Sequence, residues 1–375
     1  MEDKRVAVDR QRLSMLLRVY SLLVLMYDVM ALFFLVVTAG MEAFYHLFFP
    51  PHQKSVAGEI VLIAGAGRGL GRELAIQFSM LGATVVCWDI RPDSNEETAI
   101  KADSLGYGVG KAYAYTCDIT DREQASTGTG VMKTAERMKR EVGAVTVVVN
   151  CCNLPSPRVL TERPVPEVRK TMDVGVLSHL WTERVEDIRK HRSGNNRPAT
   201  THREYGQSRL HYHTKRNSCH RPHSLLQILQ TFLPSMQEKK HGHIVMLTSV
   251  AGLTGIRDLV PLSAAQFAVQ GLAESLNEEL RSYKPSGDVR LTLVHIYPFI
   301  VNKEMAAYAQ LRIPSYFGTI DPTTVARKII DAMRRDYVEV SIPSYLLYIG
   351  KVVSLLPRKA IYAMRELLDT GVDFG

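Results

Sequence analysis

The stretch IVLIAGAGRGLGRELAIQFSMLGATVVCWDI, residues 60–90, decides the fold. Its first five residues are apolar and rich in β-branched side chains, which predicts a short buried strand. Three glycines spaced G-x-x-x-G-x-G follow, and a segment with helical spacing at 73–81 leads to a second strand that ends in Asp89. This order of strand, glycine turn, helix, strand and acid is typical of a dinucleotide-binding unit.

The glycine turn has the chemistry of a phosphate-binding loop. Glycines let the backbone approach a pyrophosphate, and the N-terminus of the next helix offers unpaired N–H groups. Asp89 lies where a carboxylate accepts hydrogen bonds from ribose hydroxyls and repels a 2′-phosphate, which favours NAD over NADP. Arg68 keeps NADP open as the alternative, because a cation in this turn can bind a phosphate. The cofactor-binding candidates of the turn are Gly65, Gly69, Leu70 and Gly71.

Strands and helices keep alternating downstream. The segments at 112–120, 144–152, 243–249 and 289–298 read as further strands, and those at 135–143 and 266–283 as helices. Alternation of this kind predicts an α/β protein with a Rossmann-type, doubly wound parallel sheet. Ligands of such sheets bind at the carboxyl ends of the strands. Polar or turn-forming residues are predicted to stand at these ends, namely Asp118, Asn150, Ser249 and Pro298.

Charge and cysteine content exclude several classes of protein. The formal net charge is +8, but residues 183–228 alone contain ten Lys/Arg against four Asp/Glu. The excess is therefore not a basic face, and we expect no nucleic-acid partner. Five cysteines without regular spacing exclude a disulfide framework and indicate free thiols in a reducing compartment. The His and Cys residues of 211–223 are zinc-ligand types, but their spacing fits no structural site, so we predict no metal.

Residues 1–53 are predicted to form a membrane anchor. Val19–Val37 is apolar except for Asp28 and reaches about 28 Å as a helix, close to the hydrocarbon thickness. A second apolar piece, 43–51, follows Gly40, so a single span and a hairpin are both open. Basic residues before the span favour a cytoplasmic N-terminus. A single span then places the main domain across the membrane, and a hairpin returns it to the cytosol.

Several motifs resemble the short-chain dehydrogenase/reductase family. They include KSVAGEIVLIAGAGRGLGRELA, AYTCDITDRE, FLPSMQEKKHGHIV and TSVAGLTG, and the resemblance covers roughly 54–182 and 229–365. It is closest to the membrane-anchored branch with epidermal retinol dehydrogenases and lipid-droplet 17-beta-hydroxysteroid dehydrogenases. The resemblance implies an NAD-dependent oxidoreductase for a lipophilic alcohol such as retinol or a steroid. It also implies a homodimer at the endoplasmic reticulum or lipid droplet, with the catalytic domain facing the cytosol.

The family's catalytic groups are only partly kept. By the resemblance, Ser249 is the serine that polarises the substrate oxygen. Leu262 stands where the family's proton-transferring tyrosine is expected, and Gln266 where its lysine is expected. Gly175 stands in place of the helix asparagine. One Y-x-x-x-K does occur, beginning at Tyr107, but it precedes the third strand in a loop and is interpreted as chance.

The cofactor site and the domain plan also depart from the family. Ala64 replaces a threonine, the turn after Asn150 reads Cys-Cys-Asn, and Lys303 replaces a threonine expected near the nicotinamide. Asp89, Asp118, Asn150 and Pro298 are kept as cofactor candidates. The predicted plan is an anchor, a Rossmann domain with a disordered insertion, and a C-terminal apolar segment that is a substrate lid, a membrane contact or a core helix. These parts are 1–53, 54–340 with the insertion at 183–228, and 341–375.

Three functions remain open. The chain is interpreted first as a dehydrogenase-type protein that is inactive as written, a relic that folds poorly, because Leu262 cannot transfer a proton and Gln266 carries no charge. The alternative is a membrane-anchored pseudoenzyme that binds a nucleotide, a lipid or a partner protein. The third is an active retinol or hydroxysteroid dehydrogenase.

Overall fold

The computed structural model describes most of the chain in two units. The described residues are 2–106, 108, 110–120, 130–152, 164–176, 228–255, 259–282, 288–297 and 320–368. Contacts divide the chain after Gln53, into Met1–Gln53 and Lys54–Gly375. The predicted insertion at 183–228 lies almost wholly outside the described residues, and so do Tyr107, Asn153, Pro298 and Lys303.

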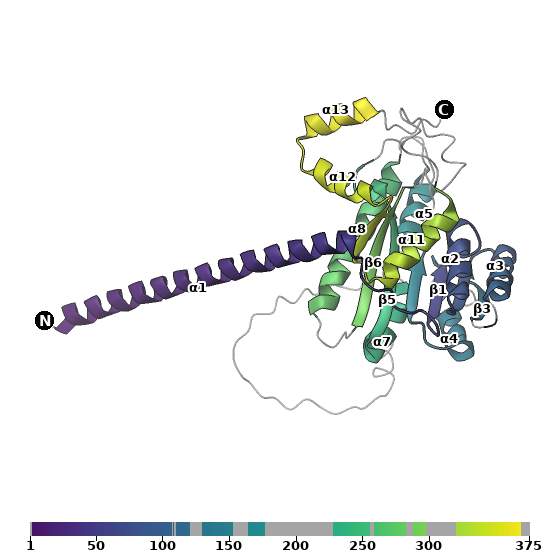
Figure 1. Cartoon of the computed structure of the whole chain (residues 1–375), viewed down its shortest axis with the longest axis horizontal. Helices are drawn as coiled ribbons and strands as arrows, with labels where there is room; N and C mark the ends of the chain where they lie inside the picture. The colour runs from purple at the N-terminus through teal and green to yellow at the C-terminus, as the bar shows by residue number, and fades with distance from the viewer. Residues whose placement is uncertain are drawn as a thin grey trace, which may run out of the picture. The chain divides into compact units, whose positions relative to one another are not determined.

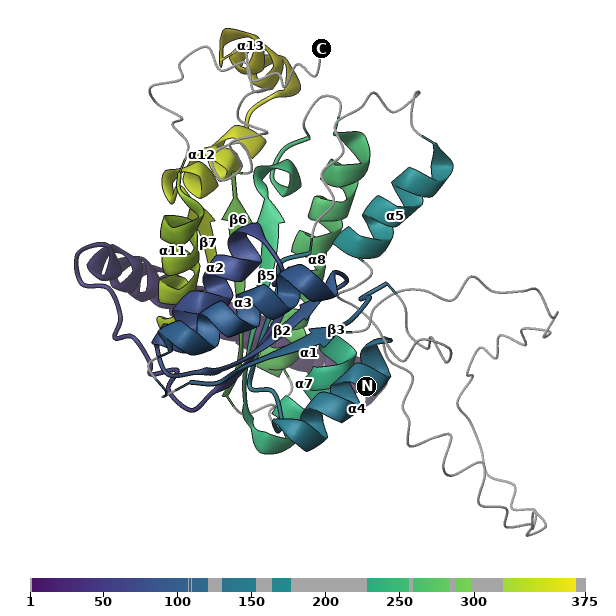
Figure 2. The same cartoon turned by 90° about the vertical axis from the view of Figure 1, so that its right-hand side faces the viewer.

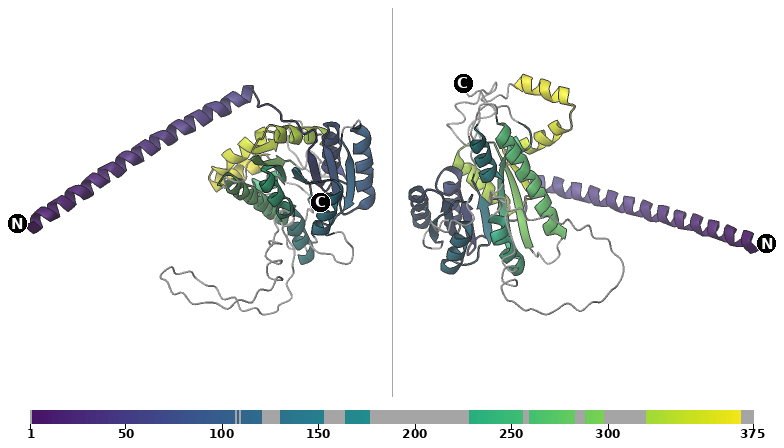
Figure 3. Two further views of the ribbon diagram at one scale, coloured as in Figure 1. Left: turned by 90° about the horizontal axis from the view of Figure 1, so that it is seen from below. Right: turned by 180° about the vertical axis from the view of Figure 1, so that it is seen from behind.

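The first unit is one long helix. Helix α1 spans Glu2–Phe48 and runs through Gly40 without a break (Figure 3). Its segment Arg18–His46 has 29 residues with a mean hydropathy of 2.4, long and apolar enough to cross a membrane. The hairpin alternative requires a turn between the two apolar pieces, and α1 contains none.

The second unit is built on a sheet with helices around it (Figure 1). The sheet has seven strands in the order β3-β2-β1-β4-β5-β6-β7. Every neighbouring pair is parallel. The order reverses between β1 and β4, so the carboxyl ends of these two strands flank the crevice in which such sheets bind ligands. The strands are β1 (Ile60–Ala64), β2 (Thr84–Asp89), β3 (Ala112–Thr116), β4 (Val147–Asn150), β5 (His241–Ser249), β6 (Asp288–Ile296) and β7 (Glu339–Ile342).

Helices cover both faces of the sheet (Figure 2). One face packs against α2 (Gly69–Met80), α3 (Pro92–Leu105) and α11 (Pro322–Arg334). The other packs against α4 (Val131–Glu141), α7 (Ile228–Lys239) and α8 (Val260–Ser282), and α5 (Val165–Gly175) lies against α8. Each interface is a core of buried apolar side chains; on the α7 side the rings of Trp88 and Phe232 are 5.7 Å apart. The predicted doubly wound α/β fold is therefore confirmed.

Several elements differ from the sequence prediction. Strand β7 was not predicted; it has only four residues, two of them polar, and the boundary drawn at residue 340 falls within it. Strand β3 ends at Thr116 and not at Asp118. Helix α8 begins at Val260, six residues before the predicted start, because a proline in the first turn of a helix gives up no internal hydrogen bond.

Lys54, the first residue of the second unit, is held by main-chain and side-chain bonds. Its backbone N–H donates to the Arg334 carbonyl at 2.7 Å, and its ammonium donates to Asp336 Oδ1 at 2.6 Å and to His243 Nδ1 at 2.8 Å. Because an ammonium can only donate, His243 carries its proton on Nε2, which donates to Thr292 Oγ1 at 2.8 Å. The Thr292 hydroxyl donates in turn to the carbonyl of Tyr337.

The chain ends in two helices after β7, namely α12 (Tyr345–Ser354) and α13 (Arg358–Leu368). Of these, α12 contacts β7.

Candidate functional site

The glycine turn between β1 and α2 is closed by backbone packing that only glycine permits. Gly65 has φ +80° and donates its N–H to the Trp88 carbonyl at 2.7 Å. A Cβ on Gly71 would overlap the carbonyl oxygen of Gly65. Gly69, with φ +56°, begins α2, and Leu70 follows in its first turn. The turn and the N-terminus of α2 therefore lie together at the carboxyl edge of the sheet, as the sequence predicts.

Asp89 is bonded to the same turn. Its Oδ2 accepts a hydrogen bond from the N–H of Gly67 at 2.9 Å, and its Oδ1 accepts from the N–H of Arg91 at 3.0 Å. A Cβ on Gly67 would come within 2.8 Å of Asp89 Oδ2, so a larger residue at this position would displace the Asp89 carboxylate. Sequence reasoning missed Gly67, although its place in the run G-A-G-R-G-L-G is the signal. Arg68, directly after it, is exposed at the N-cap of α2.

Asp118 and Asn150 each shape a turn at a strand end. Asp118 Oδ1 accepts from the N–H and the hydroxyl of Thr120, at 2.9 and 2.7 Å. Asn150 Oδ1 accepts from the N–H of Cys152 at 3.0 Å. With the glycine turn and Asp89, these side chains follow strands that are neighbours in the order β3-β2-β1-β4.

Two adjacent cysteines follow β4 beside the glycine turn. The Sγ of Cys152 lies 3.0 Å from the point that a Cβ on Gly65 would occupy, so the thiol packs against the turn. Burial raises the pKa of Cys151 to about 12 and that of Cys152 well above its ordinary value. Both thiols are therefore protonated at neutral pH, which makes them poor metal ligands. Among the described residues, the cysteines form no disulfide and no group of His, Cys, Asp and Glu could hold a metal ion.

Gln266 caps the end of β5 instead of reaching outward. Its side chain is buried, and its Oε1 accepts from the N–H of Ser249 at 2.7 Å and from the hydroxyl of Thr248 at 2.8 Å. The Ser249 Oγ accepts from the N–H of Ala251 at 3.1 Å. Sequence reasoning treated Gln266 only as the loss of a cation. The structure gives it a bonded position next to the retained serine.

Leu262 and Gly175 both lie in closely packed parts of the structure. Leu262 lies one turn before Gln266 on α8 and is 2% exposed. Gly175 is the last residue of α5, and a Cβ there would lie 3.2 Å from the Cβ of Ala265 on α8. An asparagine at 175 therefore requires the two helices to shift by a few tenths of an ångström. At these positions the chain has an alkyl side chain and a glycine, and neither carries a group that can take part in proton transfer.

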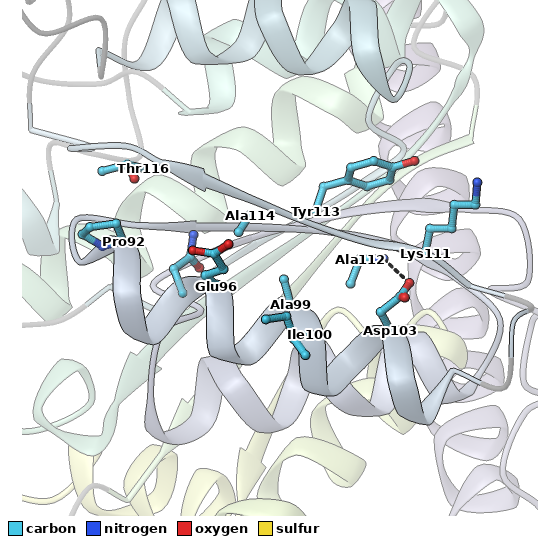
Figure 4. A pocket seen from close by; sticks show the side chains of 11 residues that line it. Pro92, Glu96, Ala99, Ile100, Asp103, Lys111, Ala112, Tyr113, Ala114 and Thr116 are labelled. Carbon is cyan, nitrogen blue, oxygen red and sulfur yellow. Dashed lines mark hydrogen bonds between the residues drawn. The ribbon is translucent and has the colours of Figure 1, made fainter.

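A separate groove of about 660 Å³ lies between α3 and the edge strand β3. Glu96, Ala99 and Asp103 of α3 face the strand, and Asp103 Oδ1 accepts from the N–H of Ala112 at 3.3 Å (Figure 4). None of the predicted cofactor residues lines this groove.

Comparison with known proteins identifies what the chain resembles. A family model described as "short chain dehydrogenase" matches residues 59–194 and 222–312. Epidermal retinol dehydrogenase 2 of Mus musculus is 32% identical over 315 residues, which are 84% of this chain and 83% of that protein. Human 17-beta-hydroxysteroid dehydrogenase 13 is 28% identical over 89% of this chain and 91% of its own length.

Solved structures agree on the fold. A metagenomic short-chain oxidoreductase in complex with NADP aligns with a TM-score of 0.51 at 19% identity, over 77% of this chain and 97% of that one. A 7 alpha-hydroxysteroid dehydrogenase complexed with NADH aligns with a TM-score of 0.52 at 18% identity, over 76% and 93%.

Proposed function

The chain belongs to the short-chain dehydrogenase family, and from that premise we propose that it binds a nicotinamide dinucleotide but has lost the family's alcohol oxidation. The observation that carries the proposal is the pair Leu262 and Gln266 on α8. One is a buried alkyl side chain, and the other is an amide whose oxygen is already bonded to Thr248 and Ser249. Neither can exchange a proton with an alcohol.

The remaining residues favour binding over chemistry. A nicotinamide cofactor supplies the hydride acceptor when it is bound. Ser249 can donate a hydrogen bond to an alcohol oxygen, but a hydroxyl alone does not remove the alcohol's proton at neutral pH. The Gly65–Gly71 turn keeps the close backbone packing that pyrophosphate binding requires, and the N-terminus of α2 follows directly.

We assign the cofactor as NAD rather than NADP. The carboxylate of Asp89 stands at the end of β2 and is fixed by the N–H groups of Gly67 and Arg91. In that place it favours ribose hydroxyls and repels a 2′-phosphate. Asp118 and Asn150 are assigned to the adenosine side of the same crevice, and Pro298 to its nicotinamide side.

The ancestral substrate is assigned as a lipophilic alcohol such as retinol or a steroid, as the names of the relatives suggest. The apolar α1 supports a membrane location, which we assign to the endoplasmic reticulum or lipid droplet, with a homodimer as the assembly. The four cysteines among the described residues form no disulfide, which supports a cytosolic domain. The basic N-terminus before an unbroken span favours the opposite orientation, with the N-terminus in the cytosol and the folded unit on the other side of the membrane. Protease protection of the folded unit in sealed microsomes distinguishes the two orientations.

The test uses the full chain in detergent. Calorimetry with NAD and with NADP measures binding, and NADH formation with all-trans-retinol measures turnover in the same preparation. Binding of NAD without turnover supports the proposal, and D89A should then narrow or remove the preference for NAD over NADP. Turnover by the unmodified chain refutes the loss of activity, and absence of binding refutes the assignment of a cofactor.

A further inference from the structure

Helix α12 carries an apolar stripe that faces solvent. Tyr345, Tyr348, Ile349 and Val352 follow the spacing i, i+3, i+4 and i+7, which places them on one side of a helix. In a helix that packs on a core, this stripe is buried; here Tyr348 is 63% exposed and Val352 61%. Leu355, just after the helix, extends the apolar surface and is 84% exposed.

The opposite side of α12 is fixed to the folded unit, so the outward direction of the stripe is not arbitrary. Leu346 and Leu347 are buried, and the N–H of Leu347 donates to Ser341 Oγ at 2.9 Å. Lys351 forms an ion pair with Glu339 of β7. These bonds and contacts keep the stripe turned away from the sheet.

The chemistry around the stripe fits a lipid surface. The segment 343–364 contains Lys351, Arg358 and Lys359 and no Asp or Glu, and Arg358 and Lys359 are exposed. Cations beside apolar side chains suit anionic lipid headgroups. Tyrosines are amphipathic and concentrate at the membrane–water interface; Tyr348 on the stripe and Tyr362 on α13 are both exposed.

The connection to α1 keeps the second unit near any bilayer that α1 enters. The five residues 49–53 separate the end of α1 from Lys54, and five extended residues reach at most about 18 Å. A tethered surface meets its partner at a high effective concentration, so even a small apolar contact is occupied. The bilayer that α1 enters is therefore the partner surface that lies within reach of the stripe.

We propose that the exposed stripe of α12, with the exposed cations Arg358 and Lys359, is a second membrane contact that lies in the headgroup region of the bilayer. This inference does not depend on nucleotide binding or on catalysis. It selects the membrane-contact alternative for the C-terminal segment over a core helix or a substrate lid.

The test places a tryptophan on the stripe of the full chain, reconstituted into vesicles of phosphatidylcholine and phosphatidylserine. In V352W the added indole is expected to lose fluorescence when brominated phosphatidylcholine replaces the ordinary lipid, because interfacial helices bury their apolar face about 5–10 Å deep. Y348W serves as a second stripe variant. I100W is the matched control, since Ile100 of α3 is 64% exposed and lies outside the stripe. The unmodified chain gives the background from Trp88 and Trp181.

Quenching in both stripe variants and not in I100W supports the contact. Equal emission with both lipids, or equal quenching at position 100, overturns it. A change in the emission of V352W that follows the protein-to-lipid ratio and not bromination shows that a second copy of the chain covers the stripe, which also overturns the proposal.

Discussion

Replacing Gln266 is expected to destabilise the folded unit. The side chain is 2% exposed, and its oxygen satisfies two buried donors, the Ser249 N–H and the Thr248 hydroxyl. A buried donor left without an acceptor costs about 1–3 kcal/mol. The Thr248 hydroxyl keeps a weak alternative, the Gln266 carbonyl at 3.4 Å, but the Ser249 N–H loses its side-chain acceptor. We therefore expect Q266M to lower the free energy of unfolding by about 3 kcal/mol.

Methionine is the informative substitution because it is close to glutamine in length and volume but lacks the amide that accepts these hydrogen bonds. Urea denaturation of the full chain in detergent, followed by the emission of buried Trp88, measures the change. E274A, at an exposed position of the same helix, is the control and should stay within about 0.5 kcal/mol of the unmodified chain. A loss below about 1 kcal/mol in Q266M would refute the view that Gln266 stabilises the end of β5 by hydrogen bonding.

Three further outcomes follow from the structure. G71A should abolish calorimetric binding of NAD because its methyl group overlaps the Gly65 carbonyl, whereas G271A, with open space around it, should bind NAD normally; equal binding by both would contradict the packing. Burial lowers the pKa of His243, so the unfolded chain gains a proton first as the pH falls; the melting temperature should drop below about pH 6.5, and H243Q should show a weaker dependence. Burial raises the pKa of Cys87 and of Cys151 to about 12, so mass spectrometry should find both unmodified by iodoacetamide at neutral pH until urea is added.

The α/β fold could be predicted because its signals are local. Strand β1, the glycine turn and Asp89 lie within 30 consecutive residues, and each has a distinct pattern. Strand β7 could not be predicted, since its four residues EVSI have little apolar content and are placed by pairing with β6. Helix α8 begins six residues before the predicted start, and Pro261 stands in its first turn, where a proline gives up no internal hydrogen bond.

The sequence predicts where the candidate site residues lie in the fold, but it does not predict the hydrogen bonds that they form. The sequence places Asp89 beside the glycine turn, because both follow neighbouring strands. It does not show that Gly67 donates to Asp89, since that bond depends on the conformation of the turn. Likewise, the spacing of Gln266 indicates a lost lysine, but only the three-dimensional structure shows the amide bonded to β5.

The bonds of Lys54 have a mechanical consequence. Any tension between a membrane-held α1 and the folded unit must pass through this residue. It is received by α11 through Arg334, by β5 through His243 and by the turn before β7 through Asp336, and Thr292 carries it on to β6. A force on Lys54 is therefore distributed over several neighbouring elements at once. If the attachment were to a single edge strand, the same force would separate that strand from the sheet.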